Sequence, residues 1–372
     1  MSSQIKPSPD HPITQSQLRI LYVAYPLLTV SEASAGGAEQ VLWTLEREMA
    51  ARGAFTTVAA SAGSRVSGEL FSTGDPCTGD DDFERRNREH QNKIVKFVRQ
   101  RSHEGRPFDL IHDMSGSFWP RAPEVEIPVL ATLHLPRNFY QPEYFENIPA
   151  NVSFNCVSDS QSRSFDFMRE LIGVVPNGIP LDHFGPDHGK CEGLLWLGRI
   201  CEEKGPHLAL DIAARSGWPI VIAGQVYPFS YHRQFFEREI EPRLQQIPNA
   251  RWVESPSAEL KSDLLRRAAA LLITSLVNET SSLVAMEAAA SGTPVIAFRR
   301  GALPEVVKDG VTGFVVEGIP EALNALTRLP MLSAGACHLH ALRRFSAEAM
   351  ADGYERLYAG LLSQPVRTLN VA

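Results

Sequence analysis

The sequence predicts an α/β protein with two domains, each built from a parallel sheet and flanking helices. Short apolar runs that end at glycine, proline or polar residues alternate with amphipathic stretches in both halves, which is typical of strand–helix–strand units. At 372 residues the chain is long enough for two domains of ordinary size. A segment rich in Pro, Gly and Asp at 180–190 indicates a linker. We therefore expect one domain over 18–180 and another over 181–344, with a disordered segment at 1–17 and a last helix at 345–362.

Composition argues against several classes of protein. Apolar residues make up 44% of the chain and charged residues 21%, as in soluble globular proteins. The net charge of −7 argues against a nucleic-acid partner. The polar segment 1–17 has no apolar core, and no run of about 18 apolar residues follows it, so we expect no signal peptide or transmembrane helix. Five cysteines without CxxC spacing favour reduced thiols and a cytoplasmic location.

The first predicted strand–helix–strand unit contains a pair of glycines. An apolar run at 19–26 is followed by a loop, by Gly36 and Gly37, and then by a helical pattern that continues through Ala51. Paired glycines before a helix allow a backbone to approach a phosphate at the helix N-terminus. A plain flexible loop would show the same two residues.

Two charged stretches follow. Asp80, Asp81 and Asp82 form a D-x-D pattern that can hold a metal ion, but the hydrophilic surroundings favour a solvated charge run. The basic stretch 84–106 has apolar residues on one helix face. It is predicted to be a surface helix, and contact with an anionic acceptor or a membrane surface is the alternative.

Two histidines stand at the ends of predicted strands. His112 is the last residue but one of the predicted strand 109–113, and His134 is the last residue of the predicted strand 129–134. Ligands of open parallel sheets bind beyond the carboxyl ends of the strands. Either histidine could equally be a structural residue.

The second half begins with a buried strand that ends at Gly198 and is followed by Arg199 and Lys204 at a helix start. Two fixed cations at such a place can bind an anionic group, although exposed surface cations would look alike. The next strand, at 219–224, ends at Gly224.

Two carboxylates flank the start of a predicted helix at 283–290. Thr280, Ser281 and Ser282 are good N-cap residues, and glycine and proline end the helix at 292–294. Glu279 therefore lies in the loop before the helix, and Glu287 lies about one and a half turns inside it. A helix N-terminus between two carboxylates, which accept hydroxyls, suits a sugar attached to a phosphate.

The stretch 279–316 resembles the E-x7-E region of retaining glycosyltransferases with the GT-B fold, sequence family 4. Gly36-Gly-Ala-Glu39 and Arg199-Ile-Cys-Glu-Glu-Lys-Gly205 are similar to two further motifs of that family, and the resemblance covers about 19–362. This sequence departs from the family at Ser281-Ser282, where Phe-Gly is usual, at Pro180, where Asp is usual, and at Glu254, where Gly is usual.

The resemblance implies two Rossmann-like domains facing each other across a cleft, with the helix at 345–362 packed back on the first domain. It also implies roles for individual residues. His134 would contact the donor sugar and assist catalysis, Arg199 and Lys204 would hold the diphosphate, Glu279 would hold sugar hydroxyls, and Glu287 would accept the ribose hydroxyls. The implied donor-binding set is completed by Gly36, Gly37, Gly198, Gly224, Thr280, Ser281, Ser282, Leu283 and Val284.

The expected activity is retaining transfer of a sugar from a nucleoside-diphosphate sugar to an acceptor hydroxyl on a glycan, a lipid-linked compound or a small molecule. Because Arg199 and Lys204 supply positive charge, no metal ion and no cofactor are expected. A sugar-nucleotide epimerase or a phosphorylase of the same fold would use the same cleft. A non-catalytic nucleotide-sugar sensor is the third possibility, which the retention of His134 and of both glutamates disfavours.

Overall fold

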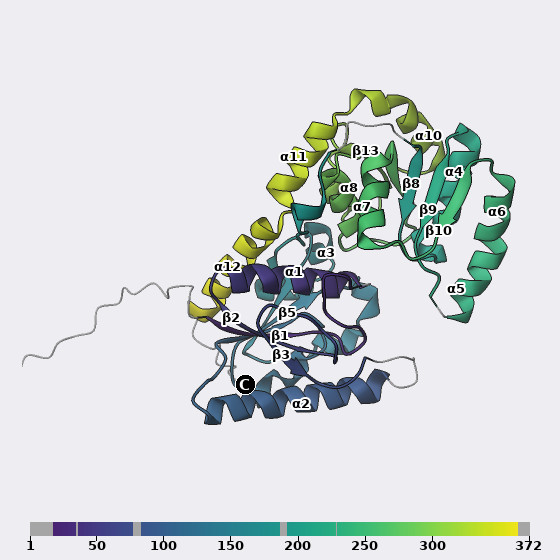
Figure 1. The fold of residues 1–372 in the computed structure, drawn as a ribbon. Helices are drawn as coiled ribbons and strands as arrows, with labels where there is room; N and C mark the ends of the chain where they lie inside the picture. The colour runs from purple at the N-terminus through teal and green to yellow at the C-terminus, as the bar shows by residue number, and fades with distance from the viewer. Residues whose placement is uncertain (1–17, 35, 77–82, 187–191, 228, 364–372) are drawn as a thin grey trace, which may run out of the picture.

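The computed structural model describes residues 18–34, 36–76, 83–186, 192–227 and 229–363. The expected segment 1–17 and Asp80–Asp82 lie outside these residues. Figure 1 shows two α/β domains joined side by side, with the last helix running from the second domain back to the first.

The first domain has a seven-stranded parallel sheet in the order β3-β2-β1-β4-β5-β6-β7. Its strands are β1 (Arg19–Val23), β2 (Phe55–Ala60), β3 (Glu69–Ser72), β4 (Leu110–Asp113), β5 (Val129–Leu133), β6 (Val152–Cys156) and β7 (Ile172–Val174). Its helices are α1 (Gly37–Ala51), α2 (Phe83–His103) and α3 (Asp159–Arg163), with short 3-10 turns at 119–124, 137–139, 142–145 and 166–171.

The second domain has a six-stranded parallel sheet in the order β10-β9-β8-β11-β12-β13. Its strands are β8 (Leu194–Leu197), β9 (Ile220–Ala223), β10 (Ala250–Val253), β11 (Ala270–Ile273), β12 (Val295–Phe298) and β13 (Gly313–Val316). Its helices are α4 (Pro206–Ser216), α5 (Ser230–Phe235), α6 (Glu241–Gln246), α7 (Ala258–Arg267), α8 (Leu283–Ala290), α9 (Leu303–Val306), α10 (Ile319–Arg328) and α11 (Ala334–Arg344), and α12 (Ala347–Ser363) follows. Short 3-10 turns lie at 181–183, 202–204 and 329–331, and a π-helical turn at 236–240 joins α5 to α6.

The strands are apolar on both faces because helices cover both sides of each sheet. In β1, Leu21 and Val23 belong to the core beneath α2, whereas Ile20 and Tyr22 belong to the core beneath α1 and α12. This alternation follows from the two-residue period of a strand. It explains why the strands are near-continuous apolar runs in the sequence, as parallel sheets require.

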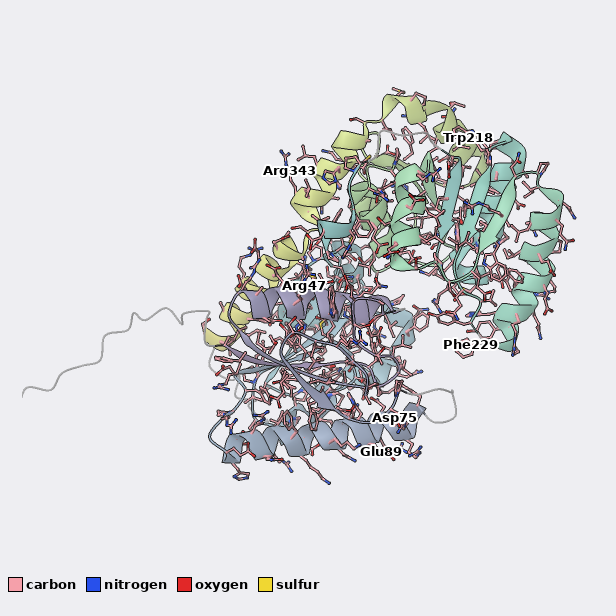
Figure 2. All side chains as sticks on the ribbon, in the orientation of Figure 1. Arg47, Asp75, Glu89, Trp218, Phe229 and Arg343 are labelled. Atoms are coloured by element: carbon pink, nitrogen blue, oxygen red, sulfur yellow. The ribbon has the colours of Figure 1, made fainter. Side chains whose placement is uncertain are left out.

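The carboxyl ends of the second sheet point toward the first domain. Trp218 precedes β9 and Phe229 follows it, and Figure 2 places Trp218 at the far end of the second domain and Phe229 at the end nearer the first domain. Ligands of open α/β sheets bind at the carboxyl ends of the strands. The structure therefore confirms the expected α/β fold and places the candidate site between the domains.

Helix α12 carries a tyrosine face that is buried against the first domain. Tyr354 and Tyr358 are 0% and 1% exposed. The hydroxyl of Tyr358 lies 2.7 Å from Nδ1 of His112, and the hydroxyl of Tyr354 accepts a hydrogen bond from Asn155 Nδ2 at 3.1 Å. At the helix surface, Arg52 donates hydrogen bonds to Asp352. A helix that follows the second domain in sequence is thus part of the core of the first.

The two chain segments that cross between the domains lie side by side. The backbone N–H of Ile179 donates to the carbonyl of Phe345 at 2.8 Å. At Gly178 an added Cβ would lie 2.6 Å from the carbonyl oxygen of Ser346, so only glycine permits this approach. The last helix begins at Ala347 rather than at the expected residue 345, because Phe345 leaves the helical conformation with ψ at 15° and ends α11.

We expect Tyr358→Phe to destabilise the protein by about 1–3 kcal/mol, because Nδ1 of the buried His112 would lose its partner. The urea midpoint of unfolding, followed by circular dichroism, measures the change. An unchanged midpoint would show that this hydrogen bond does not help to hold α12 on the first domain.

Candidate functional site

Gly198 and Gly224, two glycines of the expected donor-binding set, lie next to each other at the carboxyl edge of the second sheet. The backbone N–H of Gly198 donates to the carbonyl of Ala223 at 3.1 Å, because β8 and β9 are parallel neighbours. Gly224 has a φ of +147°, and a Cβ there would lie 1.8 Å from the carbonyl oxygen of Gly198. The absence of side chains leaves this part of the edge open to a ligand.

Lys204 and Glu279 meet at this edge, although 75 residues separate them. The Lys204 Nζ donates to both carboxylate oxygens of Glu279, at 2.7 and 2.8 Å. Gly205 makes the approach possible, because it has a φ of +70° and a Cβ there would lie 2.2 Å from the carbonyl oxygen of Thr274. The turn that carries Lys204 therefore packs against the end of β11, close to the loop that carries Glu279.

Arg199 lies near the same edge and is more exposed. Its guanidinium carbon stands 5.6 Å from the centre of the Tyr227 ring, and its Nη2 is 3.9 Å from a carboxylate oxygen of Glu203. The Arg199 side chain is 43% exposed, against 27% for Lys204. It can therefore reorient toward a ligand without breaking a close ion pair.

Helix α8 begins where the sequence predicts. Ser282 is its N-cap, and the Ser282 hydroxyl accepts a hydrogen bond from the N–H of Ala285 at 3.3 Å. The serine that replaces the usual glycine therefore stabilises the helix start. Ser281 has a buried hydroxyl that finds no partner among the described residues, so this group is available to a ligand.

His134 comes to the same place from the first domain. The Thr280 hydroxyl donates to the carbonyl oxygen of His134 at 2.9 Å, which joins the loop after β5 to the loop before α8. Burial lowers the pKa of His134 to about 4, so the imidazole is neutral at pH 7. Its Nε2 is buried and has no partner within the described parts of the chain.

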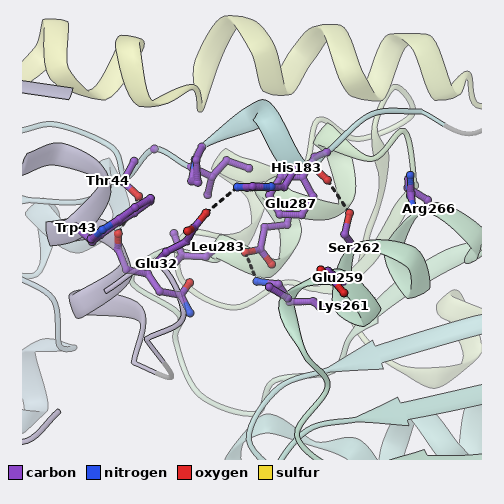
Figure 3. Close-up of a pocket in the computed structure, with 16 residues that line it drawn as sticks. Glu32, Trp43, Thr44, His183, Glu259, Lys261, Ser262, Arg266, Leu283 and Glu287 are labelled. Atoms are coloured by element: carbon purple, nitrogen blue, oxygen red, sulfur yellow. Dashed lines mark hydrogen bonds and ion pairs between the residues drawn. The ribbon is translucent and has the colours of Figure 1, made fainter. Parts of the chain in front are cut away.

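Glu287 lines a cavity of about 530 Å³ that lies between the domains, a size typical of small-molecule sites. Glu287 is 4% exposed and accepts a hydrogen bond from Lys261 Nζ at 2.6 Å. Figure 3 shows this pair facing Trp43 and Thr44 of α1 across the cavity. Lys261 is a site residue that the sequence analysis missed, because nothing in the pattern of α7 distinguishes it from a surface lysine.

The paired glycines stand at the start of α1, opposite α8. Gly36 is the N-cap of α1, and a Cβ added to Gly37 would lie 3.6 Å from Cδ1 of Leu283. Glu39, the last residue of the Gly36-Gly-Ala-Glu39 motif, is 5% exposed, and burial raises the pKa of its carboxyl. A Cβ at Gly36 would collide with that carboxylate. Gly36 and Gly37 are thus closely packed at the start of α1.

His112 and the basic stretch lie apart from this site, whereas Val284 follows Leu283, which lines the cavity. His112 is fully buried, and its two ring nitrogens lie within hydrogen-bonding distance of Tyr358 and Thr132, so its role is structural. Val284 packs against the core beneath α8. Helix α2, which carries the basic stretch, covers the face of the first domain that is turned away from the second domain (Figure 1). The Asp80–Asp82 pattern lies outside the described residues.

No helix within the described residues combines the length and the apolar composition that crossing a bilayer requires. This finding agrees with the lack of a long apolar run in the sequence.

The second domain matches a protein-family model. Residues 187–331 match the model described as Glycosyl transferases group 1. A D-inositol 3-phosphate glycosyltransferase of Geodermatophilus obscurus is 33% identical, over 53% of this chain and 52% of that protein. The chain thus aligns with about half the length of this relative.

Solved structures are similar over nearly the whole chain. Sucrose-phosphate synthase from Thermosynechococcus elongatus has a TM-score of 0.74 at 20% identity and covers 93% of this chain and 99% of its own. Anabaena HepE, in complex with UDP and glucose, has a TM-score of 0.72 at 16% identity and covers 92% of this chain and 100% of its own. At these identities the likeness establishes the fold alone. The chain therefore has the two-domain GT-B fold, and residues 187–331 of its second domain are similar to the group 1 glycosyl transferases.

Proposed function

We propose that this protein is a retaining glycosyltransferase that moves a sugar from a nucleoside-diphosphate sugar to an acceptor hydroxyl. The observation that carries the proposal is the ion pair between Lys204 and Glu279 at the N-terminus of α8. It brings a cation that suits a diphosphate into contact with a carboxylate that suits sugar hydroxyls.

The diphosphate would lie at the edge formed by Gly198 and Gly224, next to Lys204 and Arg199. Negative charge grows on the diphosphate as its bond to the sugar breaks. Cations held beside it stabilise that charge more in the transition state than in the ground state. These two residues supply the charge that a metal ion provides in other transferases, and so we propose that transfer requires no metal ion.

The sugar would lie between Glu279 and His134. An ionised carboxylate has about four lone-pair sites, so Glu279 can accept hydrogen bonds from sugar hydroxyls while it still holds Lys204. The neutral imidazole of His134 has an unpartnered Nε2, and in the tautomer protonated there it can donate to the sugar or to the oxygen of the departing phosphate. A transfer on the face that the diphosphate leaves would keep the anomeric configuration.

The nucleoside would occupy the cavity beside Glu287. The carboxylate of Glu287 can accept the two ribose hydroxyls, and Lys261 keeps this buried carboxylate compensated. Among similar proteins, HepE was solved with UDP and glucose, and the inositol-phosphate glycosyltransferases act on a phosphorylated cyclitol. UDP, ADP and GDP sugars with inositol phosphates as acceptors are therefore the first combinations to assay.

Replacing Lys204 with alanine should lower kcat by roughly 30-fold to several thousand-fold, because about 2–5 kcal/mol is lost when a buried charge is short of its partner. KM for the donor should rise as well. Lys96→Ala, which removes an exposed lysine of α2, is the matched control and should retain wild-type kinetics. Near wild-type turnover of Lys204→Ala would contradict the assignment of the diphosphate site.

The product should keep the anomeric configuration of the donor sugar. Proton NMR of the product formed first, before any mutarotation, reports this configuration through the coupling of the anomeric proton. An inverted product would exclude the front-face mechanism. Free inorganic phosphate as the acceptor, or an epimerised nucleotide sugar, would instead identify a phosphorylase or an epimerase.

Glu287→Gln should weaken nucleotide binding by about 10-fold to 150-fold, since hydrogen bonds to a charged group contribute about 1.5–3 kcal/mol. Titration calorimetry with the free nucleoside diphosphate measures this loss separately from chemistry. Glu259→Gln alters an exposed residue that lines the same cavity and should bind normally. Equal affinities of Glu287→Gln and the wild type would place the ribose elsewhere.

A further inference from the structure

Three side chains near Arg199 have no role in the reaction proposed above. Cys201, Glu203 and His232 each offer one ligand atom, and these three atoms lie within 4.8 Å of one another. Cys201 and Glu203 belong to the loop after β8, and His232 belongs to α5, which follows β9. The two loops meet because β8 and β9 are parallel neighbours and end at the same edge of the sheet.

His232 is buried without a partner. It is 1% exposed, and neither of its ring nitrogens has a hydrogen-bond partner among the described residues. Aromatic rings surround it: the ring centres of Tyr231 and Phe229 lie 4.2 and 5.5 Å from that of His232. A buried polar group that forms no hydrogen bond costs about 1–3 kcal/mol, so this arrangement calls for a ligand.

We propose that Cys201, Glu203 and His232 bind a zinc ion. A thiolate, an imidazole and a carboxylate are the ligand types that Zn²⁺ takes in proteins, whereas Mg²⁺ and Ca²⁺ select oxygen. With metal–ligand distances of about 2.0–2.3 Å, tetrahedral ligand atoms lie roughly 3.3–3.8 Å apart. Side-chain rotations that move the ligand atoms by about 1 Å bring the three atoms from within 4.8 Å to this spacing. The fourth coordination position of the zinc ion remains for water or an anion.

Zinc would displace the thiol proton of Cys201. Burial raises the pKa of this thiol to about 12, so it is protonated at neutral pH until a metal ion binds. One proton is released as the zinc–sulfur bond forms. Zinc bound here gives the imidazole its missing partner and compensates the carboxylate of Glu203.

The zinc ion would join the loop that carries Arg199 and Lys204 to α5. Arg199 is 3.9 Å from Glu203, so binding of the Glu203 carboxylate to zinc weakens its hold on Arg199 and leaves that guanidinium to a ligand. None of the three proposed zinc ligands takes part in the proposed reaction itself. Whether zinc binds can be measured without any sugar nucleotide, so failure of this inference would leave the proposed function untouched.

The test is zinc binding by the full chain after removal of bound metal with a chelator and dialysis. Competition with a chromophoric zinc chelator should show one equivalent bound, and Co²⁺ should produce a thiolate-to-cobalt charge-transfer band. Cys201→Ser and His232→Gln should each lower zinc affinity at least tenfold, and Cys201→Ser should abolish the band. Cys337→Ser, which alters another buried thiol, is the matched control and should bind as the wild type does.

Glu203→Gln guards against variants that do not fold, because its side chain is 36% exposed and its replacement leaves the core intact. This variant should also lose zinc affinity, and zinc should raise the Tm of the wild type but raise that of Glu203→Gln less. Wild-type affinity in Cys201→Ser and His232→Gln, or no zinc bound by the wild type at micromolar concentration, would overturn the proposal.

Discussion

The return of α12 to the first domain is the constraint on which the site depends. Its tyrosines are buried beneath the first sheet and hydrogen-bond to His112 and Asn155, while the chain just before it still belongs to the second domain. The other segment that crosses between the domains, at Ile179, is hydrogen-bonded to Phe345, just before α12. Two paired crossings limit how the domains can move, so the carboxyl edges of the two sheets stay opposite each other.

The two domains contribute different side chains to the candidate site. The second domain brings Lys204, Glu279 and the start of α8, all fixed by backbone packing at the edge of its sheet. The first domain brings the neutral His134, whose carbonyl oxygen is held by Thr280. A neutral imidazole and charged side chains therefore meet where the two domains face each other, at the place where we propose that the donor binds.

The shared sheet edge explains why the proposed zinc site can lie beside the proposed diphosphate site. Loops that follow neighbouring parallel strands must leave at the same edge, and β8 and β9 bring Cys201 and His232 together there. The loop after β8 thus holds two kinds of group. Arg199 and Lys204 are cations that suit an anion, whereas Cys201 and Glu203 offer a thiol and a carboxylate that suit a metal ion. Glu203 stands between the two sets and connects them through Arg199.

Local pattern alone determined a large part of this protein. The helix at 283–290 and the strand at 295–298 have the predicted bounds. N-cap serines, helix formers, glycine and proline start, continue or end an element through contacts within a few residues along the chain. The glycine-terminated strands and the division into two α/β halves were also predictable from sequence. Strand β3 was missed because an element of four residues gains its stability from its neighbours. Helix α10 was also missed, although its buried residues Ala322, Ala325 and Leu326 follow helical spacing.

Tertiary structure decided which of these residues act together. Lys204 and Glu279 are 75 residues apart, Lys261 and Glu287 are 26 apart, and His232 reaches Cys201 only because β8 pairs with β9. No local propensity encodes such pairs, since strand order and domain packing set them. Sequence placed the charged groups at the ends of strands and helices, and only the packed fold determined which of them became partners. The packed fold also left Nε2 of His134 and both ring nitrogens of His232 buried without a hydrogen-bond partner among the described residues.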